Sequence, residues 1–200
     1  MNSILALAAF DFDGTITTKN TLLEFIKFSR GKCRFYFGFL MFSPLLAAMK
    51  LKLYPNWKVK QLIFSWYFKG VSLEKFNEWG KAFSPEIEKI LRHQTIERLD
   101  FHRKSGDKII IVSASVENWI KPWAIKNDIE TVLATKIETD HNGLLTGRFS
   151  TKNCYGKEKV NRLLGVFPDR KSFKLTAYGD SRGDKELIDF ADIGFCNKLD

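Results

Sequence analysis

Short apolar runs bounded by Gly, Ser, Asn or Asp recur along the chain and predict the strands of a sheet. The runs lie at residues 4–10, 108–112, 131–137, 173–178 and 193–196. They are largely apolar at successive positions, which is typical of strands buried on both faces. The Asn142-Gly143 pair, between residues 136–139 and 144–149, also predicts a β-hairpin.

Segments with helical periodicity separate these runs. They predict helices at residues 20–29, 62–69, 73–83, 85–104, 115–126, 156–164 and 184–190, with Ser84 and Ser115 as two of the N-caps. Strands that alternate with helices predict an α/β fold with a doubly wound, Rossmann-like parallel sheet. Residues 17–84 contain no strand pattern, so we expect a small all-helical cap there, inserted after the first strand. Residues 1–16 and 85–200 then form the core domain.

The predicted cap contains an uncharged stretch, residues 35–49, that is apolar on every side and has no amphipathic face. Pro44 is expected to kink or split a helix there. Two interpretations stay open, a helix buried inside the cap and an interfacial helix that dips into a membrane, whereas a spanning helix needs about 20 residues. Basic residues flank the stretch on both sides: Arg30, Lys32, Arg34, Lys50, Lys52, Lys58 and Lys60.

Charge is unevenly distributed over the 200 residues. The net charge is +9, and residues 17–84 carry all of it, with 12 basic side chains against Glu24, Glu74 and Glu78. Such a segment favours an anionic partner: a phosphorylated substrate, acidic lipid head groups or nucleic acid. The hydrophobic content of 44% supports a packed core and argues against disorder.

Cysteine usage and the N-terminus bear on the compartment. The three cysteines are far apart and form no Cys-x-x-Cys pair, which argues against a disulfide framework or a zinc site. We therefore expect a reducing, cytoplasmic location. The first residues lack a basic region followed by a long apolar region, so we expect no cleaved signal peptide.

Polar residues follow three of the apolar runs: Asp11 and Asp13 after the first, Ser113 after the second, and Asp180 and Asp184 after the run at residues 173–178. The carboxyl ends of parallel strands meet at one edge of a sheet, and Lys157 at a predicted helix start can reach the same edge. Together these residues provide a nucleophile, an acid/base, hydrogen-bond donors, a cation and the oxygen ligands that Mg²⁺ prefers. That set indicates phosphoryl transfer.

Four motifs carry a resemblance to a known family. They are Asp-Phe-Asp-Gly-Thr at residues 11–15, Ser113 after Ile-Ile-Val, Lys157 in Gly-Lys-Glu-Lys with Lys159 as a less favoured substitute, and Gly-Asp-Ser-Arg-Gly-Asp at residues 179–184. In this order they resemble the motifs of the haloacid dehalogenase-like (HAD) superfamily of phosphohydrolases. The resemblance extends over nearly the whole chain.

The resemblance implies roles for these residues in an Mg²⁺-dependent phosphomonoester hydrolase. Asp11 attacks phosphorus and becomes an aspartyl-phosphate, while Asp13 protonates the leaving oxygen and then activates water. Ser113 and Lys157 hold phosphate oxygens. Mg²⁺ is held by Asp11, by the backbone carbonyl of Asp13 and by Asp180, with Asp184 behind them.

The helical insert resembles the cap of the phosphoserine phosphatase-like subgroup. Serine-specific members carry a Glu near the position of Asn20, and no matching cap arginine is evident here, which speaks against serine phosphate. The basic, aromatic composition is similar to the subgroup that includes phosphatidylglycerophosphate phosphatase C, and implies a lipid-phosphate phosphatase peripheral to the inner membrane as a second reading. The sequence also leaves open a phosphotransferase and, outside the enzymes, a basic nucleic-acid-binding protein.

Overall fold

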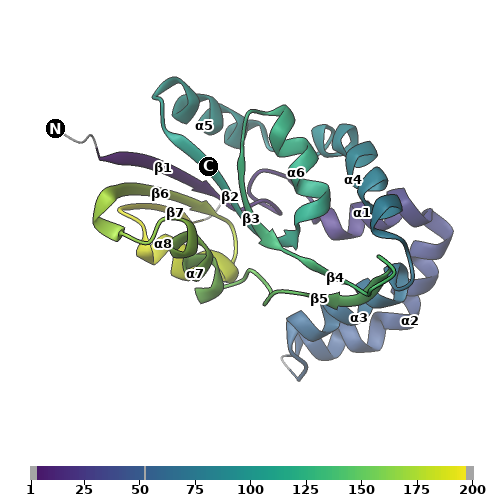
Figure 1. The fold of residues 1–200 in the computed structure, drawn as a ribbon. Helices are drawn as coiled ribbons and strands as arrows, with labels where there is room; N and C mark the ends of the chain where they lie inside the picture. The colour runs from purple at the N-terminus through teal and green to yellow at the C-terminus, as the bar shows by residue number, and fades with distance from the viewer. Residues whose placement is uncertain (1–3, 52, 197–200) are drawn as a thin grey trace.

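The core of the molecule is a parallel sheet with helices on both faces (Figure 1). The computed structural model describes residues 4–51 and 53–196, and in this part the sheet has five strands in the order β3-β2-β1-β6-β7. The strands are β1 (Leu5–Phe10), β2 (Lys108–Val116), β3 (Thr131–Thr135), β6 (Phe173–Gly179) and β7 (Ile193–Cys196). The predicted α/β fold is confirmed.

Alternation along β1 explains why both faces of the sheet are covered. Ala8 and Phe10 belong to one apolar cluster, on the face where α5 (His93–Lys104) and α6 (Glu117–Lys126) pack. Leu7 and Ala9 belong to a second cluster, on the face of α7 (Lys157–Val166) and α8 (Lys185–Phe190). Successive side chains of a strand point to opposite faces, so a strand apolar at every position requires helices on both sides. Two 3₁₀ turns, η1 (Arg170–Ser172) and η2 (Arg182–Asp184), flank β6.

Between β1 and β2 the chain forms a layer of helices: α1 (Thr21–Arg30), α2 (Lys32–Lys50), α3 (Asn56–Phe68) and α4 (Leu73–Glu88). Aromatic side chains fill its interior, and Phe25 packs edge-on against Phe76 with ring centroids 5.3 Å apart. Phe25 also stacks on Trp119 of α6 at 4.7 Å. The aromatic cluster therefore continues from the helical layer into the core.

A hairpin from later in the chain completes this layer. Its strands are β4 (Ile137–Thr139) and β5 (Leu145–Phe149). The Gly70 amide donates to the Leu145 carbonyl at 2.8 Å, and the Leu145 amide donates to the Val71 carbonyl at 2.8 Å. The hairpin predicted from Asn142-Gly143 is present, and it lies against α3 at the lower right of Figure 1.

The predicted start of a helix at Ser84-Pro85 is wrong. Helix α4 runs without a break through both residues to Glu88, and α5 begins only at His93. Phe83 and Ile87 are 1% and 0% exposed, and their burial keeps the chain helical where the local capping pattern favoured a stop. The expected boundary between residues 84 and 85 thus falls inside a helix.

Pro44 does not split α2. Proline has no N–H for the carbonyl four residues earlier, here that of Leu40. The Ser43 hydroxyl donates to this carbonyl at 2.8 Å and replaces the missing bond. Lys52, one of the predicted basic flanks, lies outside the described residues. Among the described helices, none combines the length and the apolar content that crossing a membrane requires.

Candidate active site

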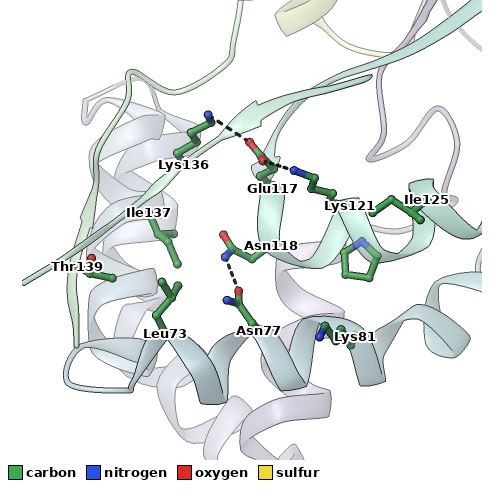
Figure 2. A pocket seen from close by; sticks show the side chains of 11 residues that line it. Leu73, Asn77, Lys81, Glu117, Asn118, Lys121, Ile125, Lys136, Ile137 and Thr139 are labelled. Carbon is green, nitrogen blue, oxygen red and sulfur yellow. Dashed lines mark hydrogen bonds and ion pairs between the residues drawn. The ribbon is translucent and has the colours of Figure 1, made fainter. Parts of the chain in front are cut away.

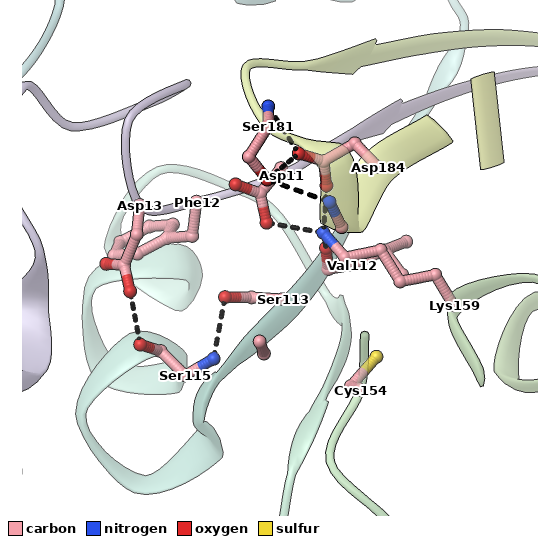
Figure 3. A network of polar contacts seen from close by, with 12 residues as sticks. Asp11, Phe12, Asp13, Val112, Ser113, Ser115, Cys154, Lys159, Ser181 and Asp184 are labelled. Atoms are coloured by element: carbon pink, nitrogen blue, oxygen red, sulfur yellow. Dashed lines mark hydrogen bonds and ion pairs between the residues drawn. The ribbon is translucent and has the colours of Figure 1, made fainter. Parts of the chain in front are cut away.

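The polar residues predicted at the strand ends do meet at one edge of the sheet. Asp11 follows β1, Ser113 lies near the end of β2, and Asp180 and Asp184 follow β6. With Lys159 of α7 they line a cavity of about 360 Å³ between the sheet and the helical layer. Figure 3 shows most of these side chains converging.

Lys159, not Lys157, reaches this edge. Its Nζ donates to Asp11 Oδ1 at 2.5 Å, to Asp184 Oδ1 at 2.5 Å and to the Val112 carbonyl at 2.7 Å (Figure 3). Lys159 is buried and Lys157 is exposed. Residues two positions apart on a helix point about 200° apart, so only one of the two lysines can face the sheet. The prediction of Lys157 at the site is corrected to Lys159.

Charge in the cavity is unbalanced. Burial raises the pKa of Asp11 to about 7 although the Lys159 ammonium lowers it, and the nearby Asp184 adds to the rise. Burial lowers the pKa of Lys159, but Asp11 and Asp184 outweigh it and hold that pKa above its ordinary value. Burial and Asp184 also raise the pKa of Asp180. The Lys159 ammonium therefore faces several carboxylates, and further positive charge would stabilise the ionised site.

The acidic cluster fits a hard divalent cation. Asp11, Asp180 and Asp184 offer carboxylate oxygens that lie within 4.8 Å of one another. Asp184 is engaged already, since Oδ1 accepts from Lys159 and Oδ2 from the Ser181 hydroxyl at 2.7 Å. Asp180 Oδ1 is buried, and no donor among the described residues reaches it. Asp11 and Asp180 are thus the side chains suited to hold Mg²⁺, while Asp184 orients Lys159 and the loop.

Gly14 makes room for this cluster. A Cβ at this position would lie 2.1 Å from Asp180 Oδ2, and φ of Gly14 is +88°. Both the close approach and the left-handed backbone require glycine. The geometry of the site therefore explains why the Asp-Phe-Asp-Gly-Thr motif has glycine at this position.

Asp13 is held apart from the cluster by residues that sequence reasoning did not assign to the site. Its Oδ1 accepts from the Thr21 amide at 2.9 Å and from the Thr21 hydroxyl at 2.5 Å. Its Oδ2 accepts from the Ser115 hydroxyl at 2.5 Å, and the Asn20 amide group lies 3.4 Å away. The position of Asn20 and Thr21 at the start of a helix next to the first motif was a usable signal.

The predicted N-cap of a helix at Ser115 is wrong. Helix α6 has Val116 at its N-cap, and the Ser115 hydroxyl is directed to Asp13. The Ser115 amide donates to Ser113 Oγ at 3.0 Å, so the two serines are coupled (Figure 3). Ser113 is 1% exposed, and it lines the cavity beside Asp11 as predicted.

Lys60 of α3 brings a second cation to the cavity. Its Nζ donates to the Ala114 carbonyl at 2.5 Å, and burial lowers its pKa to about 8 although Asp13 opposes that shift. The sequence contains no local signal that separates Lys60 from the other lysines of this basic segment. Only the packing of α3 over the sheet edge places it here.

The helical layer contributes mostly apolar side chains to the lining of the cavity, besides Asn56 and Lys60. They are Leu22, Leu23, Leu46, Met49, Val59 and Ile63. A ligand that fills the cavity would therefore meet charged groups at the sheet edge and a mostly apolar surface with Lys60 on the helical layer.

A second cavity, of about 530 Å³, lies between α4, α6 and β4 (Figure 2). Asn118 Nδ2 donates to Asn77 Oδ1 at 2.7 Å inside it, and Glu117 pairs with Lys121 at its rim. None of the residues that line it belongs to the four motifs. The residues of the four motifs therefore lie around the first cavity, at the strand ends, and not around this one.

Comparison with known proteins agrees with this arrangement. The model of the family described as haloacid dehalogenase-like hydrolase matches residues 8–189, which is most of the chain. The chain belongs to this family. A relative, the protein CicA of Caulobacter vibrioides, is 33% identical over 189 residues, which is 93% of this chain and 83% of the relative.

Solved structures of other proteins share the fold. A protein of unknown function from Bordetella pertussis Tohama I superposes with a TM-score of 0.79 at 18% identity. The superposition covers 94% of this chain and 87% of the Bordetella chain. A phospho-aspartyl intermediate analogue of phosphoserine phosphatase superposes with a TM-score of 0.63 at 16% identity, over 96% of this chain and 85% of its own. These likenesses show that the core and the helical layer occur together in other proteins.

Proposed function

We propose that this protein is an Mg²⁺-dependent phosphomonoester hydrolase that works through an aspartyl-phosphate on Asp11. The observation that carries the proposal is the pairing of the Asp11 carboxylate with the Lys159 ammonium, in a cavity where a buried oxygen of Asp180 has no donor among the described residues. The phospho-aspartyl analogue solved for phosphoserine phosphatase, a protein of the same fold, adds support.

Asp11 acts as the nucleophile. Its carboxylate oxygen forms a bond to phosphorus while the bond from phosphorus to the leaving oxygen breaks. Lys159 opposes the rise that burial causes in the pKa of Asp11, and Ser113, which lines the same cavity, would hold a phosphate oxygen. When bound by Asp11 and Asp180, Mg²⁺ would neutralise charge between the phosphate and the attacking carboxylate.

Asp13 acts as the acid and then as the base. Its carboxyl gives a proton to the leaving oxygen and later takes one from the water that attacks the aspartyl-phosphate. Hydrogen bonds from Thr21 and Ser115 hold this carboxyl in one orientation. The base step returns Asp11 to its starting state and releases inorganic phosphate.

The mostly apolar lining from the helical layer favours one substrate class, a phosphate monoester with an apolar leaving group such as a lipid phosphate. Leu46 and Met49 line the cavity and would contact such a group, and Lys60 donates to the Ala114 carbonyl next to Ser113. Asn20 stands in the place expected for an acidic residue that would hold a substrate amine, which argues against phosphoserine. We place the enzyme in the cytoplasm, in keeping with the free thiols of Cys33, Cys154 and Cys196.

Release of inorganic phosphate from a panel of monoesters tests the proposal. We expect Mg²⁺-dependent hydrolysis, with alkyl phosphates of increasing chain length preferred over phosphoserine. Asp11→Asn should lower turnover roughly 10⁴-fold or more, because the amide is a poor nucleophile. Asp100→Asn, which removes only an exposed ion pair with Arg103, is the matched control and should keep full turnover. Normal turnover by Asp11→Asn would remove Asp11 from the mechanism. Transfer of phosphate to added alcohols in place of water would identify a phosphotransferase.

A further inference from the structure

Helix α2 is apolar on two faces, and only one of them is packed. Its inner face carries Phe35 and Gly38, both buried, and the Tyr67 hydroxyl of α3 donates to the Phe35 carbonyl at 3.0 Å. Gly38 has no room for a side chain, because a Cβ would lie 2.1 Å from the Tyr67 oxygen. The inner face is thus seated closely on α3.

The outer face of α2 is open to solvent and continues into the loop after the helix. Phe37 and Leu40 lie three residues apart on this side, and Leu51, the C-cap, follows Leu40 by about three helical turns. Their exposed fractions are 64%, 72% and 71%. Of the 19 large apolar side chains exposed in the described part of the chain, nine lie between residues 36 and 57. Contiguous exposure on this scale marks an interaction surface and not a random surface.

The charge around this face selects the partner. Lys32, Lys50 and Lys58 are exposed beside it. No acidic residue occurs between Glu24 and Glu74. A symmetric contact between two copies through this face would bring their basic residues together with no acidic side chain from this stretch to pair them. An apolar face with aromatic residues and a cationic border suits an anionic bilayer, which offers hydrocarbon and negative head groups together.

We propose that the outer face of α2 and the loop after it dock on the surface of an anionic membrane. The face is defined by Phe37, Leu40, Leu51, Leu53 and Trp57, and the border by Lys32, Lys50 and Lys58. Because Leu46 and Met49 of the same helix line the catalytic cavity, docking would bring the cavity next to the bilayer. The proposal concerns binding and goes beyond the proposed hydrolysis, so each can fail without the other.

Sedimentation with vesicles tests the docking. The full chain is mixed with vesicles of phosphatidylcholine alone, or of phosphatidylcholine with phosphatidylglycerol, at low and high salt. We expect binding to the anionic vesicles that weakens as salt rises. Leu40→Gln/Leu51→Gln should weaken binding by about tenfold or more, because two apolar side chains no longer enter the interface. Lys32→Gln/Lys50→Gln/Lys58→Gln should do the same through lost attraction to the head groups.

Matched controls change similar exposed residues on the surface of the core domain, away from α2. Phe101→Gln/Ile125→Gln alters side chains that are 57% and 60% exposed, and Lys126→Gln/Lys171→Gln/Lys174→Gln removes the same number of exposed charges. Both controls should bind like the parent, and all variants should hydrolyse a small soluble phosphate at the parent rate. The proposal is overturned if the parent does not sediment with anionic vesicles, or if the α2 variants bind as well as the controls. A third outcome also overturns it: the parent forms dimers, Leu40→Gln/Leu51→Gln disrupts them, and neither the parent nor this variant binds vesicles.

Discussion

The ammonium of Lys159 lies 2.5 Å from the carboxylate of Asp11, although the two residues are separated by 148 positions in the chain. The same ammonium lies 2.5 Å from Asp184. One buried cation thus joins the end of β1, the first turn of α7 and the loop after β6. This contact sets the position of the proposed nucleophile and the charge around it.

Replacing Lys159 and Lys157 in turn tests which of the two lysines belongs to the site. Lys159→Met leaves Asp11 and Asp184 facing each other without a cation, and we expect a loss of roughly 3–5 kcal/mol in the free energy of unfolding together with loss of turnover. Lys157→Met alters an exposed side chain of the same helix and should change stability by less than about 0.5 kcal/mol. Urea unfolding in the presence of EDTA measures both. Equal effects of the two substitutions would contradict the assignment of Lys159.

Asp13→Asn should slow both halves of the reaction, because the amide can neither give a proton to the leaving group nor take one from water. The expected decrease is roughly 10²–10⁴-fold in the rates of formation and of breakdown of the phospho-enzyme. Rapid quenching with a radiolabelled monoester measures the two rates separately. Ser115→Ala, which removes one hydrogen bond to Asp13, should have a smaller effect on the same two rates. Unchanged rates in Asp13→Asn would exclude this residue from the proton transfers.

Metal binding should be visible without any assay of turnover. A cation that binds the folded site and not the unfolded chain stabilises the fold, so we expect Mg²⁺ to raise the midpoint of thermal unfolding of the parent in a concentration-dependent way. Asp180→Asn should abolish most of that rise, since Asp180 carries the buried oxygen that lacks a donor among the described residues. Asp189→Asn, which removes only an exposed ion pair with Lys185, should keep it. Activity should disappear in EDTA and return when Mg²⁺ is added in excess.

Lys60 should make stability depend on pH in a defined window. Burial lowers its pKa in the folded protein to about 8, from an ordinary value of 10.5. Between these values the unfolded chain binds the proton and the folded protein does not, so the contribution of Lys60 to stability improves as pH rises through the window. Lys60→Met should therefore be more stable than the parent at pH values below about 8, and the difference should narrow by about pH 10.5.

Unfolding of the parent and of Lys60→Met in urea across this pH range measures the difference. Lys58→Met, two residues earlier and exposed, is the matched control and should follow the parent at every pH. A difference that stays constant from neutral pH to above the window would show that Lys60 is not titrating there.

The pattern along the chain determined the fold class and the position of the chemistry. Buried strands must be apolar at successive positions, so β1, β2 and β6 were visible as runs, and the polar residues that end them marked one sheet edge. Asp11, Ser113, Asp180 and Asp184 were predicted at that edge and lie there. The hairpin was equally predictable, because Asn-Gly favours a tight turn for local reasons.

Only the tertiary structure decided between Lys157 and Lys159, since both belong to the same motif and differ only in which side of α7 faces the sheet. It also decided that Ser84 lies inside a helix and that Ser115 binds Asp13, because packing and a distant carboxylate outweigh a local capping preference. The position of Lys60 depends on how α3 lies over the sheet edge. The sequence showed residues 35–49 as apolar on every side, but which side is packed follows from the contact of α2 with α3, a relationship between segments that no local pattern encodes.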